Sequence, residues 1–419
     1  MISTDFAPNE SGDDAWLSFK LIFQPWRWLK GKETKRLRKE ISHFFETDNS
    51  NEELYVNLFL SGRGALYCLL QTLTIPKGSA ILIQGFTCEA VVLPIRSLGY
   101  TPIFIDIDPN SYSMSMNDLK KKCTPNAKVL ILQHTFGITP DRTNILKFAQ
   151  DHNITVIEDL AHGFDTEELK NNFGNSIKLL SYGRSKAISS VFGGAIVTSS
   201  EMIAKLLTEQ ENILAYPNYL QIMQILWYKP LTVFIKSSYD IFIGKLFHLL
   251  LNNTGILPRE ISSKEKNGNF DYAFAKQYPN VLSILLLHQL EKFNLSTKKR
   301  IQSVLIYQNY FNNNFLVSNN PALIRYPIIT DDRIKLLKRA QKKHIYLGKW
   351  YDQVIGPKGL NMAKVGYTLG DCPIAEDICE KIVNLPALVS KKEAERIIKL
   401  FHQKKKSRAY NTLDQSNET

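Results

Sequence analysis

Residues 154–198 read ITVIEDLAHGFDTEELKNNFGNSIKLLSYGRSKAISSVFGGAIVT. Three runs rich in apolar and β-branched residues, at 154–157, 177–180 and 195–198, have the length of strands and are separated by polar or turn-forming residues. Ligands of α/β proteins bind beyond the carboxyl ends of the strands. The polar side chains that follow the first two runs are Glu158, Asp159, His162, Ser181 and Lys186. The stretch therefore predicts an α/β fold with a binding site at these residues.

Asp159 and Lys186 are the pair that suggests a particular chemistry. A lysine amine can condense with the aldehyde of pyridoxal 5'-phosphate (PLP), and a carboxylate can keep the pyridine nitrogen of that cofactor protonated. Considered singly, an aspartate at a strand end is more often a helix cap, and a lysine is more often a solvated charge. Their combination with Ser181 and with the glycine pair at 193–194 favours a PLP site.

Three motifs carry a resemblance to a known family. The pattern ED-x-A-H at 158–162, S-Y-x-x-x-K at 181–186 and GG at 193–194 resembles the DegT/DnrJ/EryC1/StrS family of sugar aminotransferases. The resemblance extends over about residues 40–210 and 280–400. It implies a PLP-dependent transferase of fold type I, the aspartate aminotransferase fold. That fold has a large domain with a mostly parallel sheet flanked by helices, and a small α+β C-terminal domain.

The same resemblance implies a role for each motif residue. Lys186 is the lysine that would hold the cofactor, and Asp159 would pair with its pyridine nitrogen. His162 would contact the ring hydroxyl, and Ser181 would bind the phosphate. Family sites are completed across a two-fold interface, so a homodimer is expected. Members often place an asparagine upstream of a long helix to reach the partner's phosphate site, but residues 271–275 read DYAFA.

The turn at 61–64 is a second candidate phosphate site. Residues 54–73 predict a strand that runs into a helix at Ser61-Gly62, and a helix N-terminus binds phosphate through its free N–H groups and its dipole. A dinucleotide fingerprint is excluded, because Tyr67 stands where the third glycine would be. In the family, Gly62 and Arg63 would cap the cofactor phosphate, and the arginine would add positive charge.

The turn GFTCEA at 85–90 raises the question of which residue stacks on the cofactor ring. Many family members have an aromatic residue directly after the threonine, where this chain has Cys88. Phe86 is the replacement candidate, and plain packing in the core is the alternative. His134 follows the buried strand 128–133, where it would either face the cofactor or be a satisfied structural histidine.

Composition restricts the function classes. The hydrophobic content of 44% and the charged content of 22% indicate a globular protein. The net charge of +12 is compatible with nucleic acid, anionic lipid or an anionic substrate. A nucleotide-sugar is such a substrate, and with the family motifs present we expect it, together with an amino-acid donor, rather than nucleic acid.

Cysteine usage and the N-terminus indicate the compartment. The five cysteines are dispersed without a CxxC pair, which predicts reduced thiols and no zinc site. They are Cys68, Cys88, Cys123, Cys372 and Cys379. The sequence opens with a polar, acidic stretch in place of a signal peptide, so a cytoplasmic location is expected.

The chain is expected to divide into five parts. These are an N-terminal arm with a basic segment (1–45), a large PLP-binding domain (46–212), an apolar helical insertion with a linker (213–270), a long helix with the small C-terminal domain (271–402), and a disordered tail (403–419). The C-terminal part contains C-P-x-A-E at 372–376 and N-L-P at 384–386, which match family signatures.

Two segments of the chain are additional to what a minimal aminotransferase of this family contains. Residues 16–39 combine tryptophans with many basic residues, and residues 213–255 are highly apolar but contain Pro217, Pro230 and several charges. The prolines predict helices that break at these positions, without a membrane-length run. One interpretation packs both segments on the protein's own core or on a dimer partner. The other places them on the inner membrane face, by charge attraction and aromatic anchoring.

Three functions from different classes follow. The first is an aminotransferase that takes an amino group, with glutamate as the expected donor, and transfers it to a nucleotide-activated keto sugar for surface polysaccharide or a related glycan. The second is a sugar dehydratase on the same fold, which Lys186 disfavours because known relatives of that kind have histidine there. The third is a non-catalytic regulatory or scaffold protein that keeps the fold.

Overall fold

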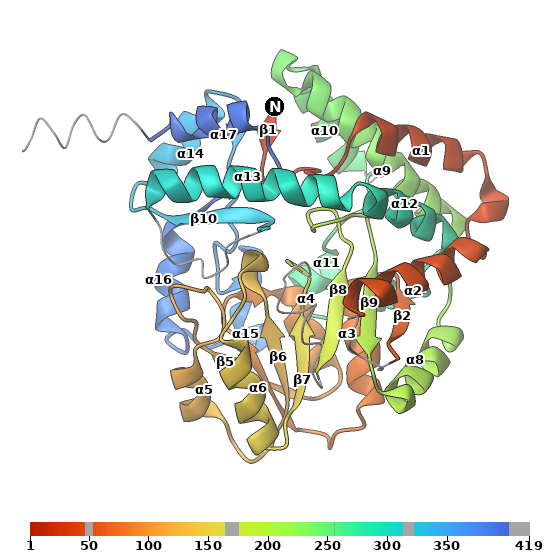
Figure 1. Ribbon diagram of the computed structural model, residues 1–419, viewed down its shortest axis with the longest axis vertical. Coiled ribbons are helices and arrows are strands. Elements are labelled where there is room, and N and C mark those ends of the chain that lie inside the picture. Colours follow the sequence, from red (N-terminus) through yellow and green to blue (C-terminus); the bar gives the residue numbers. More distant parts are fainter. Residues whose placement is uncertain (47–52, 164–175, 255, 313–321, 402–419) are drawn as a thin grey trace, which may run out of the picture.

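The computed structural model describes residues 1–46, 53–163, 176–254, 256–312 and 322–401. A seven-stranded sheet forms its centre (Figure 1). In spatial order its strands are β2 (Tyr55–Phe59), β9 (Gly194–Thr198), β8 (Ile177–Ser181), β7 (Thr155–Asp159), β6 (Ala127–Gln133), β3 (Ala80–Gln84) and β5 (Thr101–Ile105). The predicted tail at 403–419 lies outside the described residues.

The sheet is mostly parallel. All neighbouring pairs from β8 to β5 are parallel, whereas β9 runs antiparallel to both β8 and β2. Every residue of β3 and of β9 is buried, as expected for strands covered by helices on both faces. The predicted fold class, an α/β large domain with a mostly parallel sheet, is confirmed.

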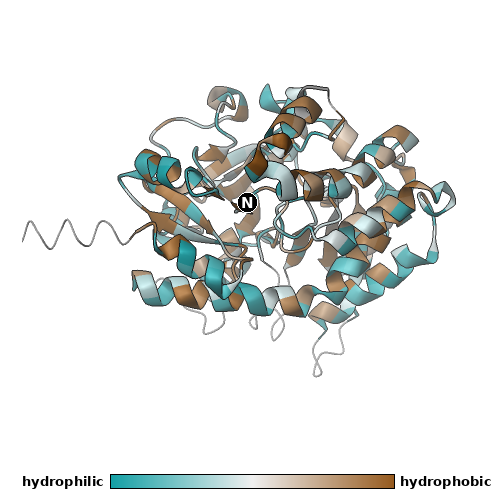
Figure 2. Cartoon of the chain, turned by 90° about the horizontal axis from the view of Figure 1, so that it is seen from above, coloured by the Kyte–Doolittle hydropathy of each residue, from teal (hydrophilic) through white to brown (hydrophobic). Residues whose placement is uncertain are grey.

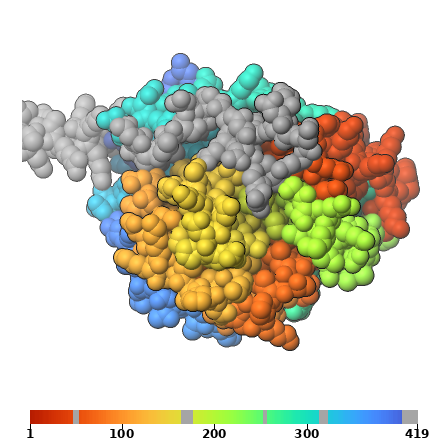
Figure 3. All heavy atoms as spheres, turned by 60° about the horizontal axis from the view of Figure 1, so that its bottom comes forward, coloured from red at the N-terminus to blue at the C-terminus, as the bar shows by residue number. Residues whose placement is uncertain are grey.

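Helices of mixed polarity cover the sheet. In Figure 2 they alternate between hydrophobic and hydrophilic residues along their length, which is typical of helices with one buried face. They are α3 (Gly62–Thr72), α4 (Glu89–Ser97), α5 (Met116–Lys122), α6 (Arg142–Asp151) and α8 (Glu201–Ile213). Figure 3 shows α8, in green, beside the red N-terminal segment. There Arg38 donates to the Glu211 carboxylate of α8.

The C-terminal part has a small sheet of its own. The strands β10 (Arg325–Ile329) and β13 (Ile382–Pro386) pair antiparallel. The N-terminal strand β1 (Ile2–Ser3) pairs with β11 (Ile345–Tyr346), and β4 (Thr87–Cys88) pairs with β12 (Ile355–Gly356). The helices of this part are α14 (Arg333–Gln341), α15 (Met362–Val365), α16 (Pro373–Lys381) and α17 (Lys391–Ile398). The pair β1–β11 connects the C-terminal part to the N-terminal arm, and the pair β4–β12 connects it to the large domain.

The long helix expected within 271–402 is formed by two consecutive helices, α12 (Asn280–Glu291) and α13 (Phe293–Phe311), which run across the molecule in Figure 1. Helix α12 is buried over most of its length. It contacts α1 (Gly12–Ile22) and α2 (Lys32–Phe45) of the N-terminal segment. The domain boundaries proposed from the sequence stay predictions.

The N-terminal segment packs on the insertion. Helix α1 lies along α9 (Tyr219–Ser238), and α2 buries Leu37, Ile41 and Phe45 as a stripe with four-residue spacing. Most of the basic side chains of α2 are on its exposed side. The short 3-10 helices of this region are η1 (Pro25–Arg27) and η3 (Tyr239–Ile241), and η3 leads into α10 (Ile243–Thr254).

The predicted helix break at Pro230 is wrong. Helix α9 continues through Pro230, although a proline removes the hydrogen bond to the carbonyl four residues earlier. That carbonyl belongs to Leu226, and it accepts a hydrogen bond of 2.7 Å from Ser18 Oγ in α1. A side chain of the N-terminal segment therefore replaces the missing donor. Among the described residues, no helix combines the length and the hydropathy needed to cross a membrane.

Candidate active site

A cavity of about 290 Å³ opens where β7 and β8 end. Its wall includes five of the seven residues predicted for the site: Gly62, Arg63, Asp159, Ser181 and Lys186. Because parallel strands present their carboxyl ends at the same edge of a sheet, Asp159 at the end of β7 and Ser181 at the end of β8 lie close together. The structure therefore brings together residues that are far apart in the sequence.

Lys186 lies in the loop that connects β8 to β9. Its backbone N–H donates to the carbonyl of Gly183 at 3.2 Å, and its Nζ lies 5.4 Å from the ring centroid of Trp350. Burial lowers the pKa of the Lys186 amine below its ordinary value, while nearby Cys88 and Asp159 oppose that shift. A lowered pKa increases the neutral fraction of an amine, and only the neutral amine is a nucleophile.

Asp159 is buried at the end of β7. Burial raises the pKa of its carboxyl group, against the opposing effect of the Ala161 N–H, which donates to Oδ1 at 2.9 Å, and of the Lys186 charge. A buried carboxylate of this kind gains most from a cationic partner, because the low-dielectric surroundings strengthen the attraction between the two charges. The carboxylate is thus suited to holding a protonated ring nitrogen.

His162 lies behind the cavity wall. Its Nδ1 accepts the N–H of Phe136 at 3.3 Å, and its Nε2 is 3.5 Å from the hydroxyl of Tyr351, which lines the cavity. Burial holds the pKa of His162 well below its usual value, so the ring is neutral. Its predicted contact with a ring hydroxyl stays a prediction. In this structure His162 lies next to two residues that line the cavity, Tyr351 and Trp350, and its ring centroid is 5.6 Å from that of Trp350.

The N-terminus of α3 borders the cavity as predicted for a phosphate site. Ser61 caps the helix by accepting the Gly64 N–H at 3.0 Å, and it donates to the Phe274 carbonyl at 2.9 Å. A Cβ has little room at Gly62 and none at Gly194. A Cβ added at Gly62 would meet Ser181 at 3.1 Å, and one at Gly194 would meet the Gly62 nitrogen at 2.5 Å. The two glycines let the helix end approach β8 and β9 closely.

Arg63 has partners of its own in the structure. Its guanidinium ion-pairs with Glu265, donates to the carbonyl of Glu260 at 3.0 Å, and lies 4.5 Å from the ring centroid of Phe274. A second carboxylate, Glu89, is 3.7 Å away. The guanidinium is thus tied to segment 260–265, and the phosphate contact expected from the sequence stays a prediction.

Phe86 does not line the cavity. Its side chain is fully buried and packs edge-on against Phe136 and Tyr351, with centroid distances of 6.1 and 5.2 Å. This position fits the packing alternative that the sequence leaves open. Cys88 is at the cavity wall, together with three aromatic residues that sequence reasoning misses, Phe192, Trp350 and Tyr351. The last two come from the C-terminal part, and no local pattern at 348–353 distinguishes them.

Three carboxylates at the cavity are also missed by sequence reasoning, Glu89, Glu260 and Asp352. Glu89 begins α4 and is buried, and burial raises its pKa to about 7 although Arg63 opposes the shift. Glu260 belongs to the stretch after the apolar insertion, for which the sequence predicts only a linker. The Arg184 guanidinium donates to the carbonyl of Pro258 and holds this stretch against the lysine loop. The stretch after the insertion therefore contributes one wall of the cavity.

His134 belongs to a buried ionic network beside the site. Its Nε2 donates to Glu158 at 2.9 Å, and Glu158 also accepts from Arg142 at 2.8 Å and from Lys178 at 2.8 Å. Burial alone would raise the pKa of Glu158, but these partners hold it well below its ordinary value. His134 thus has the position of a structural histidine.

Comparison with known proteins identifies the family. The model of the DegT/DnrJ/EryC1/StrS aminotransferase family matches residues 18–402, so the chain belongs to this family. A relative, GDP-perosamine synthase of Escherichia coli O157:H7, is 29% identical over 198 residues, which cover 46% of this chain and 50% of the relative. The chain therefore matches about half the length of that curated relative, and 30% and 39% of two others.

Solved structures show the same fold. NtdA of Bacillus subtilis with bound cofactor PMP superposes with a TM-score of 0.69 at 17% identity, over 96% of this chain and 85% of that chain. The E. coli GDP-4-keto-6-deoxy-D-mannose-3-dehydratase with bound hydrated PLP has a TM-score of 0.69 at 15% identity, over 96% and 99%. Because an aminotransferase family and a dehydratase share this fold, the fold alone does not select the reaction.

Proposed function

We propose that this protein is a PLP-dependent sugar aminotransferase. It transfers an amino group, with glutamate as donor, to the keto group of a nucleotide-activated sugar, for surface polysaccharide or a related glycan. The observation that carries the proposal is that Lys186 and Asp159 line one cavity in a chain of an aminotransferase family. The name of the relative GDP-perosamine synthase supports a nucleotide-sugar as acceptor.

The residues around the cavity fit the cofactor. Gly62 at the start of α3 and Gly194 at the start of β9 carry no side chains, which leaves room for a phosphate at the N-terminus of α3. Ser181, at the end of β8, adds a hydroxyl there. When bound, PLP supplies an aldehyde for the amine and a ring that withdraws electrons from the substrate carbon. Asp159 holds the proton on the ring nitrogen. Lys186 Nζ, whose pKa is lowered by burial, binds the cofactor and moves a proton to and from the substrate carbon.

The dehydratase alternative gains no support from the site. Lys186 occupies the position where dehydratase relatives have histidine, and its Nζ lies against the cavity wall beside Trp350. A lysine there can both bind the cofactor covalently and return a proton, which amino transfer requires. We therefore rank amino transfer above dehydration.

A direct assay tests the proposed function. Purified protein with PLP and glutamate would be given a set of nucleotide-linked keto sugars, and 2-oxoglutarate formation would be measured. We expect turnover with at least one keto sugar and none without it. Formation of a deoxy keto sugar without consumption of glutamate would support the dehydratase instead. A protein that binds no PLP would support the scaffold alternative.

We further propose that the protein works in the cytoplasm as a homodimer. The two-fold is the commonest oligomer symmetry, and cavity residues from a partner would add to those seen in one chain. Light scattering at micromolar concentration tests this proposal. An active monomer would contradict it.

We also propose a peripheral contact with the inner membrane face. Apolar side chains gather in an exposed position on η3 and α10: Ile241, Phe242, Ile243, Leu246, Leu249 and Leu250. In the N-terminal segment, Trp16, Phe23 and Trp26 are exposed as well. Together with the net charge of +12, these residues match the mixture of apolar and basic groups that binds anionic lipid surfaces.

A further inference from the structure

The loop that carries Lys186, defined here as residues 183–193, is held by side chains from three distant segments. The backbone carbonyl of Lys186 accepts a hydrogen bond from the side-chain amide nitrogen, Nδ2, of Asn9. The carbonyl of Ala187 accepts a hydrogen bond of 2.7 Å from Arg300 Nη2. The carbonyl of Ser189 accepts one of 3.0 Å from Lys229 Nζ. A loop without regular hydrogen bonding must satisfy its buried carbonyls elsewhere. Here an N-terminal arm, α13 and α9 supply the donors.

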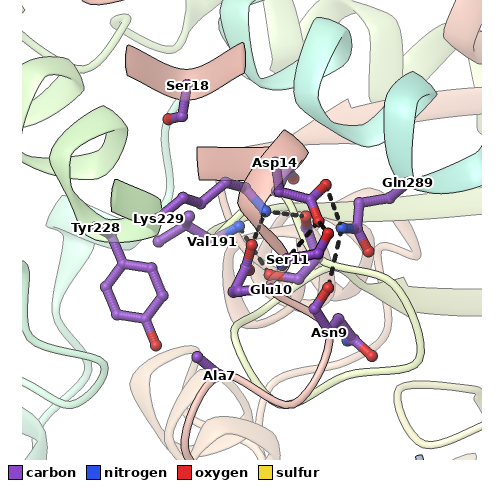
Figure 4. Close-up of polar contacts among 12 residues, drawn as sticks. Ala7, Asn9, Glu10, Ser11, Asp14, Ser18, Val191, Tyr228, Lys229 and Gln289 are labelled. Carbon is purple, nitrogen blue, oxygen red and sulfur yellow. Dashed lines mark hydrogen bonds and ion pairs between the residues drawn. The ribbon is translucent and has the colours of Figure 1, made fainter. Parts of the chain in front are cut away.

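The arm is itself anchored at the same place. The part of the N-terminal arm involved is residues 4–11. Its Glu10 accepts a hydrogen bond of 2.6 Å from Lys229 Nζ, with both side chains almost completely buried. The Asn9 side-chain oxygen accepts Arg300 Nη2 at 2.8 Å. Figure 4 shows Asn9, Glu10 and Asp14 converging with Lys229 and Gln289 next to Val191 of the lysine loop. Arg300 and Lys229 thus each bind the arm and the loop at once.

The contact between the arm and the loop contains a buried ion pair, Glu10–Lys229. A buried ion pair such as Glu10–Lys229 costs desolvation and is weak evidence for stability, so its retention favours a role in geometry. The position of the Lys186 side chain in the cavity that it shares with Asp159 depends on the backbone of the loop. Misplacement of a reacting group by about 1 Å can cost about 100-fold in rate.

We infer that the N-terminal arm is a positioning element of the active site, in which Asn9 orients the Lys186 backbone and the Glu10–Lys229 pair anchors the arm. The inference rests on the proposed function for its kinetic consequence. Asn9 is a positioning residue and touches no substrate. Its effect is transmitted through the carbonyl of Lys186 and through Arg300.

Two substitutions at Asn9 separate its two contacts. Asn9→Ala removes both the donor to Lys186 and the acceptor for Arg300. Asn9→Asp keeps the acceptor but replaces the donor by an oxygen that repels the carbonyl. Lys292→Met is the matched control, because Lys292 also holds the start of α1, through Asp13 at 2.9 Å and Asp14 at 2.8 Å, but does not contact the loop.

Hydrogen exchange of the cofactor-free protein gives a readout that needs no activity. The amides of Lys186 and Ser190 are bonded within the loop region, to the carbonyls of Gly183 and Tyr182. We expect both Asn9 variants to exchange these amides about five- to tenfold faster, as for the loss of one hydrogen bond. Exchange in the arm should rise in Asn9→Ala only. Lys292→Met should leave the loop unchanged.

Kinetics supply the second readout. In both Asn9 variants kcat should fall by about 10- to 100-fold with KM nearly constant. The pH at which the absorption band of the bound cofactor titrates should shift as well, since the surroundings of Lys186 change. Unchanged loop exchange in both variants would overturn the inference even if the wild type is an active aminotransferase. Faster loop exchange in a protein without transferase activity would leave the inference standing and refute the proposed function.

Discussion

Ser18 Oγ donates a hydrogen bond of 2.7 Å to the carbonyl of Leu226, the acceptor that Pro230 leaves without its helical donor. A proline inside a helix normally costs about 3 kcal/mol or more. The contact between α1 and α9 supplies a donor for that carbonyl inside a buried interface, and Ser18 is itself fully buried. The N-terminal segment and the insertion therefore depend on each other for stability.

Ser18→Ala should lower the free energy of unfolding by about 1–3 kcal/mol, because it leaves a buried carbonyl unsatisfied. Chemical denaturation measures the change. Ser237→Ala is the matched control, because that hydroxyl is exposed and bonds only within α9. If Pro230→Ala is introduced first, the restored N–H can reach Leu226, and Ser18→Ala should then cost clearly less. Equal losses in both backgrounds would show that the hydroxyl does not replace the missing donor.

Lys186→Ala should abolish amino transfer while the thermal unfolding midpoint stays close to that of the wild type, since the side chain lines a cavity and its removal opens no new void in the core. In the wild type, borohydride reduction with bound PLP followed by peptide mapping should label Lys186. Labelling of another lysine would show that the assignment is wrong.

Asp159→Asn should keep part of the cofactor affinity but slow turnover by roughly 100-fold or more, because a neutral amide does not hold the ring nitrogen protonated. Stopped-flow measurement of the reaction with glutamate alone isolates this step from sugar binding. Turnover within a factor of two of the wild type would refute the role of Asp159.

Glu89→Gln should make stability less dependent on pH. Because burial raises the pKa of Glu89 from 4.5 to about 7, the protonated form is favoured in the folded state. The stabilising contribution of protonated Glu89 to the free energy of unfolding is complete below pH 4.5 and is lost as the pH rises through 7. The variant should match the wild type at pH 4.5 and exceed its free energy of unfolding by up to about 3 kcal/mol at pH 8. Denaturation at both pH values measures this, and parallel pH profiles would contradict it.

The apolar surface on α10 predicts binding to anionic liposomes at low salt. Leu246→Gln with Leu249→Gln should reduce flotation severalfold, because these exposed side chains would enter the lipid interface. Leu369→Gln, at an even more exposed leucine of the C-terminal part, is the control and should float like the wild type. A wild-type protein that stays at the bottom of the gradient would refute the membrane contact.

The sequence by itself determined the fold class and grouped five residues that line the cavity, although most of the cavity wall comes from residues that it did not single out. Strand patterns are local, and the carboxyl ends of neighbouring parallel strands meet at one edge of a sheet. The strand pattern and the motif spacing are therefore enough to group Asp159, Ser181 and Lys186 at one site. The glycines at 62 and 194 are likewise visible in the sequence as a turn and a strand start. The packing of α3 against β8 and β9 leaves little room for a side chain at Gly62 and none at Gly194.

Tertiary packing decided what no local pattern records. Trp350, Tyr351 and Glu260 reach the cavity from segments far along the chain, and Phe86 points into the core because the core offers it aromatic neighbours. Sequence rules predict a helix end at Pro230, since they count only hydrogen bonds within the helix, whereas Ser18 supplies one from outside. Hydrogen bonds and contacts between distant segments depend on how helices and strands pack, and the identity of the partners is set only when the chain is folded.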